Sequence, residues 1–351
     1  MFPETRATRL FGVRLPIVQT GMGWVSGATL TAATSAAGGL GILASATMTL
    51  EELDAAITKV AGRTGSPFGV NLLPNAPDAA DRIAMIIERK VPVASFAAAP
   101  RPEQITRLAD SGVSTIVTVG ARRHAEKVAQ LGVSAVIAQG GEGGGHTGTI
   151  PTSLLLPQVV DAVAGTDVVV LGAGGFFDGR GLAVALTYGA DGIAMGTRFL
   201  LTQESQVPQS VKDIYLATSP TGTVVTSAID GAPQRVNRTE MIDDLEKSVF
   251  SRFPRAALNA LRFRSQTGTS LADLVRTGLA MKKDQDLTWA QVALAANAPM
   301  MTKAAMVDGR PEVGILPTGQ VVGVIGEVPS VAELLAGIEA EALAALESAG
   351  S

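Results

Sequence analysis

The residues with the clearest chemical potential lie in one glycine-rich stretch, QGGEGGGHTG, at residues 139–148. Six of its ten residues are glycines, and it carries one of only two histidines in the chain. A backbone with so few side chains can lie flat against a planar ligand while His146 presents an imidazole. Histidine changes its charge near neutral pH, so His146 could take a proton from an acidic carbon or return one to an enolate. The alternative is a loop histidine bonded only to backbone. Its place among glycines after an apolar run favours catalysis.

Two further glycine turns could hold a phosphate group. Gly174-Gly175 and Gly196-Thr197 each follow an apolar run. Glycine lets backbone N–H groups approach an anion, a following helix N-terminus adds its dipole, and Thr197 adds a hydroxyl donor. The alternative is a pair of tight turns that need glycine for a positive φ. Two such turns in neighbouring loops favour a phosphate site.

Several other chemistries find no support. The absence of cysteine excludes disulfides, thiolate catalysis and cysteine-ligated metals. Glu142 and His146 are four residues apart, but the glycines between them argue against a rigid helix, and no third ligand is near, so no metal site is expected. No nucleophile elbow is present. His124, at the start of a predicted helix, is expected to be a solvated surface residue. A histidine without nucleophile or metal indicates that a cofactor supplies the redox chemistry.

Eight short apolar runs must position these residues. Runs that are apolar on both faces are typical of strands buried in a parallel sheet, and the segments between them indicate helices. One helix is predicted from Leu50 to Ala61, because Thr49 and Glu52 form a capping-box pattern. The runs are residues 16–20, 41–45, 68–73, 91–97, 114–120, 134–140, 168–174 and 192–198.

Eight strands alternating with helices over about 200 residues predict an α/β fold of the (β/α)₈ TIM-barrel type. The rival is a doubly wound open sheet, which usually has fewer strands and a glycine-rich turn after its first one. Here glycine turns follow the sixth, seventh and eighth runs as well as the first. The active site of a barrel lies at the carboxyl ends of its strands, where these turns and Asn71 fall.

The chain is divided into three parts by this pattern. Residues 1–205 are predicted to form the barrel, and residues 206–310 a mainly helical insertion or cap whose only clean strand is 223–229. Residues 311–351 are predicted to return to the barrel, where the Ala/Leu/Glu-rich helix 328–349 closes the outer ring.

Composition and charge indicate the class of partner and the cellular compartment that are expected. A net charge of −4 gives no indication of nucleic-acid binding. The N-terminus has no apolar signal core, and no uninterrupted apolar run reaches the roughly 20 residues of a membrane span. A soluble, cytoplasmic protein with a small-molecule substrate is expected. The oligomeric state stays open, with a homodimer as one expectation.

At these residues the chain resembles the nitronate monooxygenase (2-nitropropane dioxygenase) family, FMN-dependent barrels that also include flavin enoyl-ACP reductases. The matching segments lie between residues 10 and 205: PIVQTGM, AAGGLGIL, FGVNLL, QGGEGGGHTG, LGAGGFFDGRGLAVALTYGADGIAMGTRFL and Glu204-Ser205.

The resemblance implies FMN as cofactor and His146 as catalytic base. It implies that residues 21–23 pack their backbone against the flavin and that Asn71 and Gln139 hydrogen-bond it. A positive neighbour usually balances the pyrimidine edge of reduced flavin, and Arg101 and Arg122 are the nearest candidates in the sequence. The implied cofactor-binding set is Gly21, Met22, Gly23, Asn71, Gln139, Gly144, Gly145, Gly174, Gly175, Met195, Gly196 and Thr197.

A more specific resemblance is to an actinobacterial branch of the family that acts on CoA thioesters in steroid-ring degradation. The segments PIVQTGMGWVSGATL and GILASATMTLEELDAAITKV and the long region after the barrel carry it. This likeness implies a CoA-thioester substrate and NAD(H) as co-substrate.

A basic segment fits such a substrate. Residues 247–283 hold eight basic residues against one acid, Asp273, and a cationic cap would attract several phosphates. The alternative is a solvated basic helix surface. Trp24, Arg262 and Arg264 are the predicted substrate contacts.

Three functions stay open on the sequence: a nitronate monooxygenase, an oxidoreductase of CoA or ACP thioesters such as an enoyl-ACP reductase, and a non-redox barrel enzyme or phosphate-ligand binder that uses His146 alone.

Overall fold

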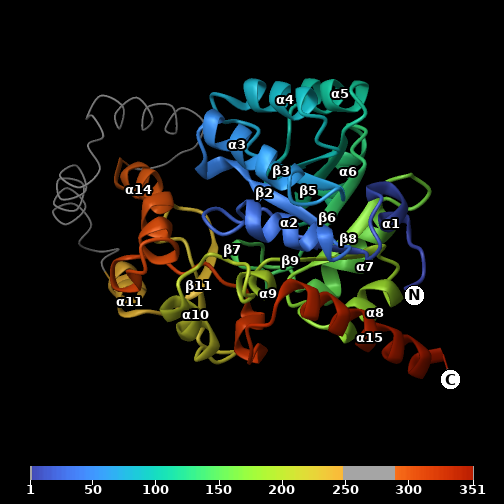
Figure 1. Cartoon of the computed structure of the whole chain (residues 1–351). Helices are drawn as coiled ribbons and strands as arrows, with labels where there is room; N and C mark the ends of the chain where they lie inside the picture. The colour runs from blue at the N-terminus through green and yellow to red at the C-terminus, as the bar shows by residue number, and fades with distance from the viewer. Residues whose placement is uncertain (1, 248–288, 351) are drawn as a thin grey trace.

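A closed barrel of eight parallel strands forms the centre of the computed structural model, which describes residues 2–247 and 289–350 (Figure 1). The predicted (β/α)₈ barrel is therefore confirmed, and each apolar run overlaps one strand. The strands, in order around the barrel, are β1 (Ile17–Gln19), β2 (Leu40–Ala44), β3 (Phe68–Leu72), β4 (Val93–Phe96), β5 (Ser114–Val119), β6 (Ala135–Gln139), β8 (Val169–Ala173) and β9 (Gly192–Met195).

Each strand is followed by a helix on the outside of the barrel. The capping box predicted for α3 is present, because Glu52 N donates to Thr49 Oγ1 at 3.1 Å and Thr49 N to Glu52 Oε2 at 2.8 Å. The outer helices are α2 (Ala28–Ala36), α3 (Leu50–Ala61), α4 (Ala79–Glu88), α5 (Pro102–Asp110), α6 (Arg122–Ala129), α7 (Thr152–Ala162), α8 (Gly179–Thr187) and the short α9 (Thr197–Leu200).

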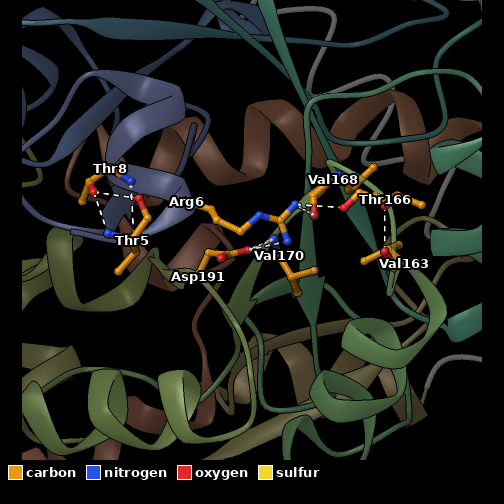
Figure 2. Close-up of polar contacts among 8 residues, drawn as sticks. All are labelled: Thr5, Arg6, Thr8, Val163, Thr166, Val168, Val170 and Asp191. Carbon is orange, nitrogen blue, oxygen red and sulfur yellow. Dashed lines mark hydrogen bonds and ion pairs between the residues drawn. The ribbon is translucent and has the colours of Figure 1, made fainter. Parts of the chain in front are cut away.

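The amino-terminal end of the barrel is plugged by helix α1 (Arg6–Phe11). Ala7 and Phe11 join the apolar cluster that fills the barrel interior. Figure 2 shows how the helix is anchored: the Arg6 guanidinium donates to the carbonyls of Thr166 and Val168, at 3.1 and 3.0 Å, next to Asp191. Asp191 in turn accepts from Val170 N at 2.9 Å. With this end closed, the opposite end is left for a ligand.

The C-terminal helix α15 (Val331–Gly350) packs against α8 and α2. It lies between them because the helix after β9 has only four residues. Gly179 permits the close approach, since a Cβ there would lie 2.4 Å from Ala342 N. Helix α15 thus completes the outer ring where the barrel closes between β9 and β1.

The region after α9 adds a small second core and a second sheet. Strand β11 pairs with both β10 and β7, and Ile229, Val236 and Ile315 are buried beside it. The sequence did not predict β11, because Val236 is its only apolar residue. The elements are α10 (Gln209–Leu216), β10 (Thr223–Thr226), β11 (Gln234–Asn237), β7 (Gly145–His146), α11 (Glu240–Lys247), α14 (Trp289–Met306) and the 3₁₀ turns Ser45–Thr47, Pro311–Val313 and Gln320–Val324.

No helix in the described ranges is both long and apolar enough to cross a membrane.

Candidate active site

A cavity of roughly 870 Å³ opens at the carboxyl ends of the barrel strands. Fourteen of the predicted site residues line it, whereas Arg262 and Arg264 lie outside the described residues. The two candidates for the flavin pyrimidine edge, Arg101 and Arg122, do not line it. The lining residues that the sequence singled out are Gly21, Met22, Gly23, Trp24, Asn71, Gln139, Gly144, Gly145, His146, Gly174, Gly175, Met195, Gly196 and Thr197.

His146 forms a hydrogen-bonded pair with Asp230 in this cavity. His146 Nε2 lies 2.8 Å from Asp230 Oδ2. The imidazole is 66% exposed, so a ligand can reach it, whereas the carboxylate is only 13% exposed. An ionised carboxylate can only accept hydrogen bonds, so Nε2 carries a hydrogen, and the neutral tautomer that fits this pair has its lone pair at Nδ1.

Asp230 is held in its ionised form by its neighbours. Burial alone would raise the pKa of its carboxyl group. The hydrogen bond to His146, the charge of that ring when protonated, and the hydrogen bonds from Ala232 N and Gln234 Nε2 all lower it. The net result is a pKa below the ordinary value. The Asp230 carboxylate is therefore charged in the folded protein at neutral pH.

The lowered pKa of Asp230 makes its contribution to stability dependent on pH. A carboxyl group with a lower pKa in the folded state stabilises the fold fully above its unfolded pKa, and this stabilisation is lost as the pH falls through the folded pKa. We expect Asp230→Asn to lower the melting temperature at neutral pH. The difference in melting temperature between the variant and the unchanged protein should shrink once the pH falls below 3.8, the ordinary pKa of an aspartate side chain. Thermal melts of both proteins across that range would measure it, and a constant difference would contradict the assignment.

The glycine-rich loop is fixed by residues from the later part of the chain. Gly145 and His146 form β7, which pairs antiparallel with Arg235 and Gln234 of β11. The Arg235 guanidinium also donates to Gly141 O at 2.9 Å. This second sheet therefore sets where His146 stands.

Close packing, rather than contact with a ligand alone, explains several of the loop glycines. A Cβ on Gly140 would lie 2.0 Å from Thr152 Oγ1, and one on Gly144 would lie 2.5 Å from Gly319 N. A Cβ on Gly145 would have no neighbouring atom within 4 Å, and it is the φ of +64° that favours glycine there. Glu142 is occupied structurally, because its carboxylate accepts from Thr152 N at 2.9 Å and Thr152 Oγ1 at 2.7 Å.

The two predicted phosphate turns meet at one side of the cavity. The backbone N–H groups of Gly174, Gly175, Gly196 and Thr197 donate to no other atom of the described residues. Gly174 and Gly175 adopt positive φ angles of 95° and 83°, which glycine adopts without strain. Thr197 Oγ1 accepts from Gly319 N at 2.8 Å, which leaves its own hydroxyl hydrogen to donate. Such a group of unpaired donors fits a phosphate.

One part of the phosphate prediction needs correction. The first N–H groups of α8, the helix after the Gly174-Gly175 turn, are not available to an anion. Gly181 N donates to Asp178 Oδ1 at 2.9 Å, and Gly179 N to Glu341 Oε2 at 3.0 Å. The chain's own carboxylates cap this helix, so only the turn glycines and the start of α9 face the cavity.

The two predicted amides lie at the carboxyl ends of β3 and β6. Gln139 Nε2 donates to His146 O at 2.8 Å, so this side chain also supports the loop. Asn71 is buried and has weak contacts with Ser95 at 3.3 and 3.4 Å. The carbonyl oxygens of both amides accept no hydrogen bond from the described residues, which leaves them for a ligand N–H group.

Trp24 forms part of the cavity wall in an unusual backbone conformation. Its φ is +65°, a strained value for a bulky residue. Its indole Nε1 donates to Pro299 O of α14 at 2.9 Å, and Lys303 Nζ lies 5.7 Å from its ring centre. Trp24 therefore joins the barrel to the cap at the cavity wall.

The described wall contains no lysine or arginine. Its ionisable side chains in these ranges are Glu142, His146 and Asp230. Neither Arg101, at the start of α5, nor Arg122, in α6, lines the cavity. The two arginines proposed for the flavin pyrimidine edge therefore do not occupy this wall.

Sequence reasoning missed Asp230, Gln234 and Arg235. They lie in a stretch with weak apolar periodicity, where the signals were the turn pair Asp230-Gly231 and the nearby Pro233. Those signals predict a loop but do not indicate that it returns to the barrel mouth.

The chain is similar to known proteins over nearly its whole length. The family model described as nitronate monooxygenase matches residues 4–84 and 78–341. A Mycobacterium tuberculosis protein named (3aS,4S,5R,7aS)-5-hydroxy-7a-methyl-1-oxo-octahydro-1H-indene-4-carboxyl-CoA dehydrogenase is 54% identical over 349 residues, 99% of this chain and 98% of the relative.

Solved structures agree with this similarity. FabK from Thermotoga maritima aligns with a TM-score of 0.82 at 34% identity, covering 99% of this chain and 98% of FabK. Nitroalkane oxidase from Streptomyces ansochromogenes aligns with a TM-score of 0.75 at 30% identity, covering 99% of this chain and 100% of that protein.

Proposed function

The chain belongs to the nitronate monooxygenase family, and on this basis we propose that it is an FMN-dependent dehydrogenase of a CoA thioester with a fused bicyclic acyl group. Family membership makes it an oxidoreductase and sets aside the non-redox hypothesis. The observation that carries the substrate proposal is the 54% identity over 99% of the chain to a relative named for such a thioester.

The wall of the cavity fits FMN. The unpaired N–H groups of residues 174, 175, 196 and 197 would hold the phosphate, and the free amide oxygens of Asn71 and Gln139 would accept from the flavin ring. When bound, FMN supplies a two-electron acceptor or donor beside the substrate.

His146 would handle the proton. A thioester carbonyl acidifies the C–H on the carbon next to it, and a neutral imidazole can remove that proton through its free Nδ1. Asp230, on the far nitrogen, orients the ring and stabilises the positive charge that it acquires. The hydrogen on the neighbouring carbon leaves with its electron pair, so the acyl group loses two hydrogens in total.

Nitronate oxidation is the second candidate, favoured by the likeness to nitroalkane oxidase. A nitro group also acidifies the adjacent C–H, so His146 would take that proton from a neutral nitroalkane, whereas a nitronate has already lost it. The two functions therefore differ in the acyl and CoA recognition rather than in the base. Reduction of an enoyl thioester, the third activity that the sequence suggested, is the reverse direction of the proposed chemistry.

The test uses the purified holoenzyme. We expect a yellow protein that releases FMN on denaturation, and whose flavin is reduced in anaerobic stopped-flow by the thioester that the relative's name specifies. Ethyl nitronate should reduce it at least tenfold more slowly. The reverse order would replace the proposal with nitronate oxidation.

Several narrower statements remain predictions. We propose NAD⁺ as the acceptor that restores oxidised FMN. The NADH that forms absorbs at roughly 340 nm, and the rise in this absorbance would measure the reaction. A homodimer and a cytoplasmic location remain expectations from the sequence.

A further inference from the structure

A second pocket adjoins the active-site cavity and has a different chemical character. This rim pocket, of roughly 670 Å³, lies between the start of α6, the end of the glycine-rich loop and α7. Its lining residues are Gly120, Ala121, Arg122, Arg123, His124, Glu126, Thr147, Gly148, Thr149, Ile150, Gln158 and Pro233.

The two cavities share part of their walls. Gly120, Thr147, Gly148 and Pro233 line both of them. Thr147 directly follows His146 in the chain. A ligand with its reacting group at His146 could therefore continue over Thr147 and Gly148 into the rim pocket.

Cationic side chains distinguish the rim pocket from the active-site cavity. Arg122 pairs with Glu126 at 2.9 Å, whereas Arg123 makes no ion pair with any described residue. The contact of Arg123 is a long one of 3.4 Å, from its Nε to His124 Nε2. The described wall of the active-site cavity, by contrast, has Glu142 and Asp230 and no lysine or arginine.

The hydrogen-bonding groups of the rim pocket suit phosphate. A guanidinium binds phosphate oxygens through paired N–H groups, and the Thr149 hydroxyl adds a donor. The Thr147 hydroxyl donates to Gly140 O at 3.2 Å instead. Helix α6 also begins here without a side-chain cap on its first N–H groups. In a chain with net charge −4, an arginine without an acidic partner beside the catalytic cavity indicates an anionic ligand group.

We propose that the rim pocket binds the phosphate-bearing adenosine end of the CoA thioester, with the ribose 3′-phosphate against Arg123. This inference rests on the proposed function, because it assumes that the acyl end lies at His146. The diphosphate-linked adenosine of NAD(H) has related chemistry but lacks the 3′-phosphate, so the two sources can be separated.

The experiment measures the binding of free CoA, 3′-dephospho-CoA and NADH to the FMN-loaded enzyme by calorimetry. It does not require turnover, so a failure of the dehydrogenase proposal leaves it interpretable. The variants are Arg123→Ala, Arg123→Lys and, as matched control, Arg107→Ala. Arg107 is an exposed arginine in the last turn of α5, which lies at the opposite end of the barrel.

We expect Arg123→Ala to weaken CoA binding about tenfold, consistent with losing a charge-assisted hydrogen bond at an exposed site. Binding of 3′-dephospho-CoA should change by less than about twofold, Arg123→Lys should keep part of the affinity, and Arg107→Ala should bind like the unchanged enzyme. The CoA effect should shrink at high salt because the site is exposed.

Three results would overturn the inference. One is CoA affinity unchanged in Arg123→Ala. Another is an equal loss for CoA and 3′-dephospho-CoA, which would remove the 3′-phosphate from this pocket. The third is a selective loss of NADH binding, which would assign the pocket to the dinucleotide.

Discussion

Replacing His146 with alanine is expected to leave FMN bound and to reduce turnover by about 10²–10⁴-fold, the usual contribution of a positioned general base. The imidazole lines the cavity, is largely exposed, and has one nitrogen committed to Asp230. Its side chain makes no contact that fixes the phosphate turns, so the cofactor should stay. Flavin absorbance of the purified variant and anaerobic flavin reduction by the thioester would measure the two properties separately.

Two variants control this prediction. Arg107→Ala changes an exposed arginine of α5 that lines neither cavity, and it should not alter the rate of flavin reduction. The other histidine, His124, is exposed on α6 as the sequence predicted, but it lines the rim pocket and is therefore no control. Asp230→Asn keeps the imidazole but loses the carboxylate that orients it and stabilises its positive charge, so a loss of up to about 10⁴-fold is expected, as when the carboxylate behind a catalytic imidazole becomes an amide. Full turnover in His146→Ala would remove this residue from the chemistry.

Thr197→Val is expected to weaken FMN binding about tenfold or more while leaving riboflavin binding nearly unchanged. The variant loses the hydroxyl that would donate to the phosphate, and a hydrogen bond to a charged group is worth about 1.5–3 kcal/mol. Riboflavin has the same ring without the phosphate, so it reports any general damage to the cavity. Fluorescence titration of the apoprotein with both flavins would give the ratio of the two affinities.

Thr197→Ser is the matched control for this substitution. Serine keeps the oxygen that accepts from Gly319 N at 2.8 Å, so both the loop and the phosphate donor should survive. Valine leaves that buried N–H without its acceptor, which should cost about 1–3 kcal/mol of stability, visible as a lower melting temperature. Equal weakening of FMN and riboflavin in Thr197→Val would place the phosphate elsewhere.

The structure of the cap could not be predicted from patterns in the sequence. Strand β11 has a single apolar residue, Val236, and its buried neighbours Gln234 and Asn237 are polar, so its periodicity is too weak to predict a strand. Asp230 lies 84 residues after His146 in the sequence, and only this pairing brings the two together. The arginines predicted to contact CoA lie outside the described residues, whereas Arg123, near a histidine expected to be a plain surface residue, lines a pocket beside the active site.

The amino-acid sequence by itself determined the barrel, its eight strands and the set of residues at its mouth. These features are local: apolar runs, capping boxes and glycine turns follow from the preferences of neighbouring residues, and the barrel brings all strand ends to one rim. The tertiary structure alone decided that Asp230 holds His146, that α8 is capped by the chain's own carboxylates, and that a cationic pocket joins the cavity. Each of these depends on contacts between distant segments, whose pairing is set by the packing of the whole chain and leaves no period in the sequence.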